Sequence, residues 1–153
     1  NGGAETGETP SSYYGNRYQH VALAGGAWNW HSKDFARTFS VQLLWKYYFA
    51  NHHRDMGAFN SWQLTEVWST TFAHGLCTFD GYCDLWYNKR VNGNLVLQSE
   101  PQFWFNLNTI KGWEKIKLSL GSEVEVSNNF VYNEYGKNNK FYAIPTVAAK
   151  WTF

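Results

Sequence analysis

The sequence predicts an all-β protein: an antiparallel transmembrane β-barrel of the up-and-down type, to which this chain contributes about seven strands. Three observations predict this class. The last thirteen residues alternate between apolar and mixed side chains and end on Phe153. Aromatic residues make up 20% of the chain, with 9 Trp, 10 Tyr and 11 Phe. The segments between the predicted strands alternate between short and long, as the turns and loops of outer-membrane barrels do.

The closing segment, residues 141–153, carries its apolar side chains at odd positions. Alternation of this length is typical of a strand between two different environments. In a soluble sandwich the apolar face would pack on a second sheet. Aromatic residues at both ends of the face favour instead a face that meets lipid between two aromatic belts. The odd positions are Phe141, Ala143, Pro145, Val147, Ala149, Trp151 and Phe153.

The composition fits a barrel and excludes a helical membrane protein. The mean hydropathy is −0.50, and the chain has no run of about 18 apolar residues that could form a transmembrane helix. A barrel keeps a polar average because its lipid-facing and lumen-facing residues alternate. The formal net charge of +1 gives no sign of a polyanionic partner, so we expect no nucleic acid.

The first predicted strand, about residues 18–30, has two possible outward faces. Val21 and Leu23 favour the odd positions, whereas Trp28 and Trp30 favour the even positions, which we take as outward. Six further segments alternate in the same way and are predicted as strands. They span about residues 36–48, 61–72, 77–88, 95–106, 115–130 and 141–153.

Three residues interrupt this pattern, whereas the two cysteines follow it. Glu66 places a charge on the outward face of the third strand, so either the register shifts there or the carboxylate finds a partner. Pro101 and Pro145 lie inside strands, where proline usually marks an edge. Cys77 and Cys83 lie on one strand about 20 Å apart at roughly 3.3 Å per residue. A disulfide cannot span that distance, so we expect two free thiols on the apolar face.

The connections predict an orientation. Long loops are expected near residues 52, 91 and 135, and short turns near 33, 74 and 110. With the carboxy terminus in the periplasm, all the long loops lie outside the cell, as in known barrels. Residues 1–12 then form an external loop or the end of a preceding strand, and residues 13–153 form the carboxy-terminal part of the barrel.

The strand count predicts that further strands complete the barrel. Single-chain bacterial barrels have an even number of strands and both termini in the periplasm. An odd number of additional strands is therefore expected, either from a missing amino-terminal part or from a companion chain. The alternative is that residues 1–12 hold an eighth strand, which would close a small barrel.

Three segments resemble strands of the nucleoside-specific channel-forming (Tsx-like) outer-membrane proteins. They are residues 99–106 (SEPQFWFN), 121–130 (GSEVEVSNNF) and 145–153 (PTVAAKWTF). The similarity covers most of residues 18–153 and looks closest to an uncharacterised branch of that family. The resemblance implies a monomeric twelve-stranded barrel with a narrow pore that passes nucleosides, and five strands beyond the seven predicted here. No motif in this sequence identifies which of its residues correspond to the substrate-binding residues of the family.

The inward positions suit a polar solute. Aromatic faces stack on bases for about 1–3 kcal/mol each, and carboxylates and amides accept hydrogen bonds from sugar hydroxyls. Inward charges can equally pair to stiffen the wall, and inward rings can simply fill it. Lys115 and Lys117 of the sixth strand are also expected inside. The pore-lining candidates are Tyr48, Asp80, Tyr82, Asp84, Trp86, Glu100, Gln102, Trp104, Glu123, Glu125, Tyr142 and Lys150.

The sequence therefore predicts an outer-membrane channel of a Gram-negative bacterium for passive uptake of small polar solutes such as nucleosides. A structural or accessory barrel that binds a partner protein is the alternative. A barrel enzyme is less favoured, because no serine motif accompanies the histidines. His52, His53 and Asp55 could hold a metal, but adjacent histidines in an exposed loop are more often solvated. We expect no catalytic residue, cofactor or metal.

Overall fold

The computed structural model describes residues 2–5, 19–50, 57–89, 93–130 and 141–152. They form β-strands, connecting turns and one short 3-10 helix, η2 (Leu107–Thr109). None of these described residues belongs to a helix that is long and apolar enough to cross a membrane. The strands are β1 (Gly2–Glu5), β2 (Gln19–His31), β3 (Arg37–Tyr48), β4 (Phe59–Phe72), β5 (Cys77–Tyr87), β6 (Leu95–Ser99), β7 (Gln102–Asn106), β8 (Leu118–Asn128) and β9 (Phe141–Trp151).

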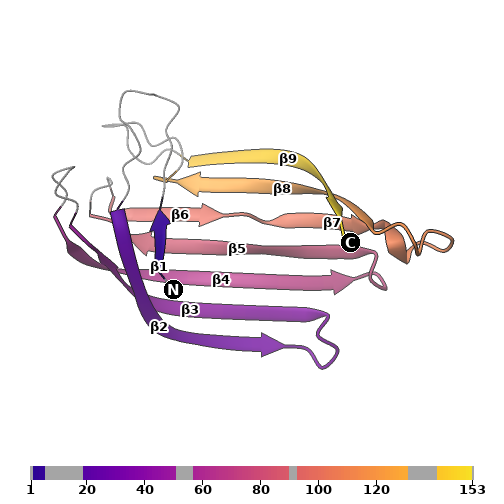
Figure 1. Cartoon of the computed structure of the whole chain (residues 1–153), viewed down its shortest axis with the longest axis horizontal. Helices are drawn as coiled ribbons and strands as arrows, with labels where there is room; N and C mark the ends of the chain where they lie inside the picture. The colour runs from indigo at the N-terminus through magenta and orange to yellow at the C-terminus, as the bar shows by residue number, and fades with distance from the viewer. Residues whose placement is uncertain (1, 6–18, 51–56, 90–92, 131–140, 153) are drawn as a thin grey trace.

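All the strands belong to one antiparallel sheet, which confirms the predicted all-β antiparallel class. Strands that are consecutive in sequence lie side by side, except β6 and β7, which lie end to end (Figure 1). β6 and β7 share the same two neighbours, β5 and β8, so the nine strands fill eight positions. β9 forms one edge; β1, together with the part of β2 beyond Ala22 that β1 does not cover, forms the other. Within the described residues the two edges do not pair with each other, and the sheet is open.

Residues 1–12, expected as an external loop or the end of a preceding strand, contain β1. This short strand pairs with the first residues of β2, with Gly2 opposite Ala22 and Glu5 opposite Gln19. The pairing therefore lies at the end of the sheet to which the long loops attach. The long loops themselves, residues 51–56, 90–92 and 131–140, lie outside the described residues.

The strand register divides the side chains between two faces. Directly opposed residues of an antiparallel pair project from the same face. Phe39 lies opposite both Trp30 and Trp68, and Leu64 lies opposite both Leu43 and Leu85. The pairing carries this face, which we call the outer face, across the whole sheet; the other is the inner face. The even positions of β2 belong to the outer face, as the sequence favoured.

Burial shows that the sheet curves toward its inner face. The outer face is strongly exposed, with 64% exposure at Leu43 and 95% at Val147. In Figure 1, β2 bends across the sheet at one edge. Except for Cys77, the buried strand residues lie on the inner face. They are Val21, Lys46, Tyr48, Phe59, Ser61, Gln63, Trp86, Val96, Trp104 and Ser127.

Proline interrupts the predicted fifth strand without shifting its register. The sequence predicted one strand over residues 95–106, but the structure separates β6 from β7 at Glu100 and Pro101. On β5, Cys83 lies opposite Ser99, and Asp80 lies opposite Gln102, so both halves keep the same alignment. Proline has no N–H to donate to a ladder, and the break is confined to its own position.

Pro145 lies at the open edge, which explains why it is tolerated within β9. It faces Val124, whose N–H donates in the opposite direction, to the carbonyl oxygen of Pro101 at 3.0 Å. The Val124–Pro145 pair is therefore a non-hydrogen-bonded pair of the antiparallel ladder. The missing N–H of Pro145 would point to the edge, where no described strand needs it.

Glu66 remains on the outer face, because no register shift removes it. It lies opposite Val41 and Cys83 in an unbroken ladder. Among the described residues its carboxylate makes no hydrogen bond or ion pair. Cys77 and Cys83 are both free thiols on the same face, as predicted.

The connections at the other end of the sheet are short turns and one longer segment. In the turn between β2 and β3, the Ser32 hydroxyl donates to the Asp34 carboxylate, and this bond lowers the pKa of Asp34. The segment between β7 and β8 spans residues 107–117, which is longer than the turn expected near 110. Lys115 and Lys117 are exposed in it and do not lie on the inner face as the sequence suggested.

Two adjacent glycines, Gly25 and Gly26, provide a test of how closely β2 approaches β3. A Cβ on Gly25 would clash with the carbonyl oxygen of Leu43 and would lie 2.8 Å from the Cα of Leu44, whereas a Cβ on Gly26 has no atom within 4 Å. We expect Gly25→Ala to destabilise the sheet by about 1–3 kcal/mol, as overpacking does. Gly26→Ala should change stability by less than about 0.5 kcal/mol.

Urea unfolding followed by tryptophan fluorescence measures both variants. Equal stability of the two would contradict the close approach of β2 to β3 at Gly25.

Candidate functional site: the polar inner face

The inner face carries all twelve of the pore-lining candidates, although not Lys115 and Lys117, which the sequence also placed inside. Asp80, Tyr82, Asp84 and Trp86 alternate along β5 with outer-face residues, and the register extends this face in both directions to β3 and β9. The remaining candidates follow from the same pairing: Tyr48, Glu100, Gln102, Trp104, Glu123, Glu125, Tyr142 and Lys150. The structure brings ten of them together in three groups; Glu125 and Tyr142 belong to none of these.

The first group centres on Gln102. Its amide nitrogen donates to the Glu123 carboxylate at 2.7 Å, and its amide oxygen accepts from the Trp104 indole at 3.2 Å. The Lys150 ammonium lies 4.4 Å from the centroid of the Trp104 ring, a cation–π contact. Asp80 lies opposite Gln102, and one of its carboxylate oxygens is buried without a hydrogen-bond partner in the part of the chain that the structure describes. This group places two carboxylates and one amine on β5, β8 and β9, around Gln102 and Trp104 of β7.

The second group is a chain of side-chain hydrogen bonds from an amine to a carboxylate, which we call the relay. The Lys46 ammonium donates to the amide oxygen of Gln63 at 3.0 Å, and the Gln63 amide nitrogen donates to the Thr65 hydroxyl at 3.0 Å. Thr65 in turn donates to Asp84. Nearby, the Tyr82 hydroxyl donates to Glu100 at 2.8 Å. Uncharged side chains thus join opposite charges across β3, β4 and β5.

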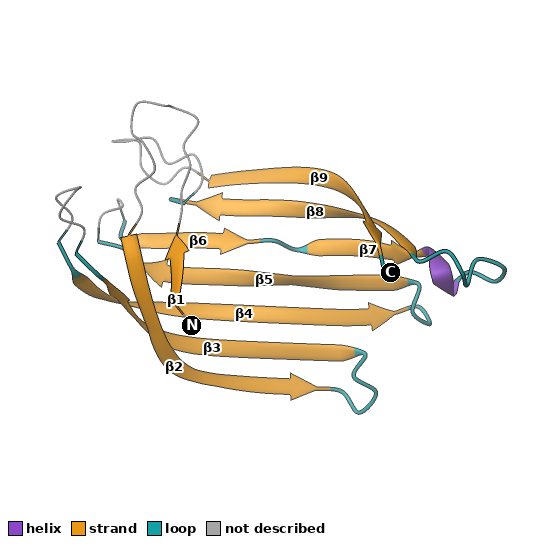
Figure 2. Cartoon of the chain, viewed as in Figure 1, coloured by secondary structure: helices purple, strands orange, loops and turns teal. Residues whose placement is uncertain are grey.

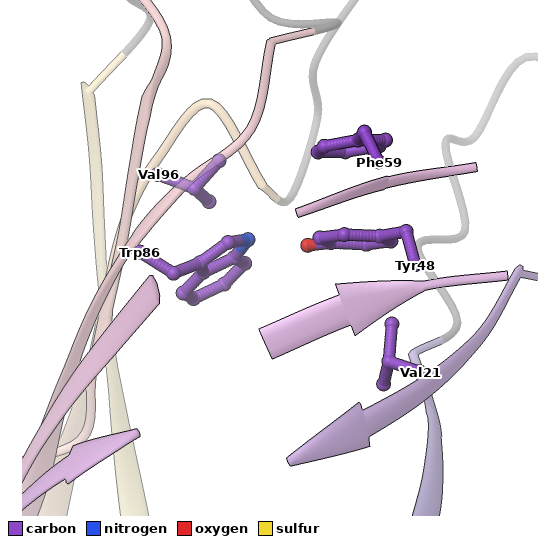
Figure 3. Packing of buried hydrophobic residues seen from close by; sticks show 5 residues of the cluster. All are labelled: Val21, Tyr48, Phe59, Trp86 and Val96. Carbon is purple, nitrogen blue, oxygen red and sulfur yellow. The ribbon is translucent and has the colours of Figure 1, made fainter. Parts of the chain in front are cut away.

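The third group is an aromatic cluster at the long-loop end. It comprises Val21, Tyr48, Phe59, Trp86 and Val96, with Phe130 packed against it (Figure 3). The rings of Tyr48 and Phe59 stack at 4.3 Å, and Trp86 meets Phe130 edge-on.

A buried amine lies within this cluster. The Lys46 ammonium is 4.5 Å from the Trp86 ring and 5.2 Å from the Tyr48 ring, and its side chain is 0% exposed. Figure 3 shows the Tyr48 hydroxyl and the Trp86 indole nitrogen pointing toward each other. Among the described residues, that nitrogen has no hydrogen-bond partner.

The exposed fractions distinguish the aromatic candidates that pack against neighbours from those that are accessible. Tyr48 and Trp86 are each 3% exposed and Trp104 is 6% exposed, so these rings pack against neighbours and offer no free face to a solute. The partly exposed aromatic candidates are Tyr82 and Tyr142.

A glycine explains the position of Trp104. A Cβ on Gly121, opposite Trp104, would approach the Trp104 ring to 2.6 Å. The glycine therefore gives the indole room to lie against the β8 backbone.

Carboxylates outnumber amines on the inner face of the described strands β2–β9. The amines are Lys46, which is buried, and Lys150, which lies beside Trp104. Glu125 makes no hydrogen bond with a described residue. The accessible inner face is therefore acidic. The carboxylates are Asp80, Asp84, Glu100, Glu123 and Glu125.

Two residues of the relay were not singled out from the sequence. Gln63 and Thr65 occupy odd positions of a strand whose even positions carry the outer face. Their odd positions predicted that both side chains lie on the inner face, but did not predict that Gln63 is buried or bonded to Lys46. Neither side chain is charged, so nothing in the sequence marked them as partners of a buried amine.

The described residues contain no group of three or more His, Cys, Asp or Glu side chains that could hold a metal ion. His52, His53 and Asp55, considered as a metal site, lie outside the described residues. The described histidines, His20, His31 and His74, lie at strand ends or in a turn.

Comparison with known proteins places the chain in a family. The family DUF5020, described as a domain of unknown function, matches residues 1–153. The chain belongs to this family. No curated protein and no solved structure matches it.

Removing the Gln63 amide tests the relay. Gln63→Leu takes an acceptor from the buried Lys46 ammonium, so we expect a loss of about 1–3 kcal/mol of stability. Gln63→Glu keeps an acceptor oxygen and should retain more of the stability. Gln98→Leu is the matched control, because Gln98 lies on the same face and its side chain makes no hydrogen bond with a described residue. Urea unfolding measures all three, and equal losses for Gln63→Leu and Gln98→Leu would contradict the relay.

Proposed function

We propose that the protein forms part of an outer-membrane β-barrel of a Gram-negative bacterium, with its outer face in lipid and its inner face lining a passage for small polar solutes. The observation that carries the proposal is the contrast between the faces. The outer face is apolar and exposed across the sheet, whereas the inner face is polar and acidic. Soluble proteins rarely expose a continuous apolar surface of this kind.

Two aromatic belts on the outer face support an orientation across a bilayer. Phe141 and Trp151 lie at opposite ends of β9 and are 63% and 59% exposed. Ten residues at about 3.3 Å each span about 33 Å; at a tilt of about 40°, this is about 25 Å along the membrane normal, the height of the apolar band in such barrels. Aliphatic residues such as Leu43 and Val147 lie between the belts.

The belts continue across other strands. Cross-strand ring contacts join Trp28 to Phe39, Trp68 to Phe79 and Phe72 to Phe103. The long-loop belt is Trp45, Tyr47, Trp62, Tyr87 and Phe141; the turn-end belt is Trp30, Phe39, Trp68, Phe72, Phe79, Phe103, Phe105 and Trp151. Trp and Tyr are enriched at both interfaces of membrane proteins. In this orientation the turn end, with the carboxy terminus, is periplasmic.

The open edges indicate what the barrel still requires. Unpaired backbone groups are not tolerated in the hydrocarbon of a bilayer, so the edges of β1 and β9 need strand partners. We propose that further strands complete the barrel, either from an amino-terminal part of the same protein or from a companion chain. The resemblance to Tsx-like channels favours a narrow twelve-stranded barrel.

The chemistry of the inner face favours a solute with hydroxyl groups or positive charge. Its carboxylates accept hydrogen bonds, and Tyr82 and Tyr142 provide partly exposed rings on which a base could stack. Nucleosides, implied by the resemblance, fit these groups. We assign no catalytic residue, cofactor or metal to the protein, and no nucleic-acid partner.

A structural or accessory barrel that binds a partner protein is the second candidate. The aromatic cluster around Trp86 favours it, because these side chains fill part of the inner face at the long-loop end. Conduction distinguishes the two, since a filled lumen passes no ions.

Planar-bilayer recording of the full-length protein tests the channel. We expect ion conductance with a preference for cations, because acidic groups line the inner face, and a lower current when nucleosides are added. Glu125→Gln should weaken the cation preference. Glu66→Gln, which removes the same charge from the outer face, is the matched control and should leave it unchanged. Absence of conductance would refute the channel and favour the structural barrel.

Glu66 tests the contact between the outer face and lipid. A charge in the apolar band is costly, though less for carboxylates than for amines. We therefore expect Glu66→Leu to stabilise the protein in vesicles by about 1 kcal/mol, measured by urea unfolding. A clear destabilisation would show that Glu66 binds a partner and does not face lipid.

A further inference from the structure

The segment between β7 and β8, residues 107–117, contains a row of apolar residues at every third position. Backbone hydrogen bonds join Leu107 to Ile110, Ile110 to Trp113 and Trp113 to Ile116, each from an N–H to the carbonyl three residues earlier, at 2.8–3.1 Å. Residues i and i+3 of such a turn lie within about 7 Å of each other. Successive turns therefore bring the backbone positions of these four residues close together along the segment.

This row is exposed. Ile110, Trp113 and Ile116 are 39%, 45% and 36% exposed, although hydrogen bonds fix both ends of the segment. Thr109 donates to the carbonyl of Asn106 at 2.7 Å, and the N–H of Thr152 at the end of β9 donates to the carbonyl of Lys117 at 2.9 Å. An ordered backbone that leaves three large apolar side chains in solvent indicates a contact surface.

Amines accompany the apolar row. Lys111, Lys115 and Lys117 are all exposed within the same eleven residues. The segment also contains Glu114, whose carboxylate accepts the Gly112 N–H at 2.9 Å, a bond that lowers its pKa and keeps it ionised at neutral pH. The segment thus has a net charge of +2.

The place of the segment in the fold indicates its partner. It projects beyond the strands at the turn end (Figure 2) and joins β7 to β8. The outer-face residues at the adjoining ends of these strands, Phe105 and Leu120, are 47% and 45% exposed. The apolar row is therefore continuous along the chain with the face assigned to lipid. Apolar residues with lysines at the edge of a membrane span are typical of contact with anionic headgroups.

We propose that residues 107–117 bind anionic phospholipid headgroups at the periplasmic surface of the membrane. Ile110, Trp113 and Ile116 enter the interface, and the three lysines contact lipid phosphates. This inference rests on the proposed insertion of the sheet, because the surrounding lipid is what brings headgroups to the segment.

Fluorescence quenching in vesicles tests the proposal with the full chain. An environment-sensitive label is placed at Trp113→Cys in a Cys77→Ala/Cys83→Ala background, and at Val147→Cys as a marker of insertion. Vesicles contain phosphatidylcholine brominated near the top of its acyl chains, with or without phosphatidylglycerol. We expect about twofold stronger quenching at position 113 when phosphatidylglycerol is present, as for a basic segment at an anionic surface.

Charge variants identify the amines. Lys111→Gln/Lys115→Gln/Lys117→Gln should abolish the effect of phosphatidylglycerol at position 113. Lys33→Gln, which removes an exposed amine from the turn between β2 and β3 at the same end of the sheet, is the control and should leave the effect intact.

The outcomes separate the two proposals. Two outcomes overturn headgroup binding but remain consistent with insertion. One is quenching at position 147 without quenching at position 113; the other is quenching at position 113 that does not depend on phosphatidylglycerol. Absence of quenching at both positions overturns insertion and the inference with it.

Discussion

The antiparallel pairing keeps the same register before and after the break at Pro101. The division of the side chains into an outer and an inner face depends on this register. A shift of one residue in any strand would exchange its inward and outward side chains. Pro101 removes an N–H from the middle of the sheet, yet Ser99 and Gln102 remain aligned with the same strand, β5. The apolar positions of seven separate segments therefore join into one continuous surface.

Glycine and proline are placed where the ladder can accommodate them. Gly25 allows β2 to approach the backbone of β3 closely, and Gly121 makes room for the Trp104 ring. Pro145 lies with its nitrogen toward the open edge. Such positions are typical of curved sheets, in which glycine marks bends and close approach. Curvature toward the inner face then buries long polar side chains that a flat sheet would leave exposed.

The inner face combines two arrangements of charge. Toward the long-loop end, Lys46 is fully buried between aromatic rings and connects through Gln63 and Thr65 to Asp84. Such a network stiffens the sheet, because every break would leave a buried polar group unsatisfied. Nearer the middle of the strands, carboxylates such as Glu123 and Glu125 are partly exposed. The proposed passage therefore has a packed part and an acidic, accessible part, and only the second can contact a solute directly.

The sequence by itself determined seven strand segments to within a few residues, the apolar side of the closing strand and the separation of the two cysteines, because a period of two is a local property of the chain. It did not predict β1 or the division of the fifth segment into β6 and β7. It also placed the twelve inward candidates on one side of their strands. It could not determine that Tyr48, Trp86 and Trp104 are buried, that Gln63 bonds to Lys46, or that Lys115 and Lys117 leave the sheet for a segment of turns. These features depend on sheet curvature and cross-strand neighbours. Only the tertiary structure brings together the residues that decide them.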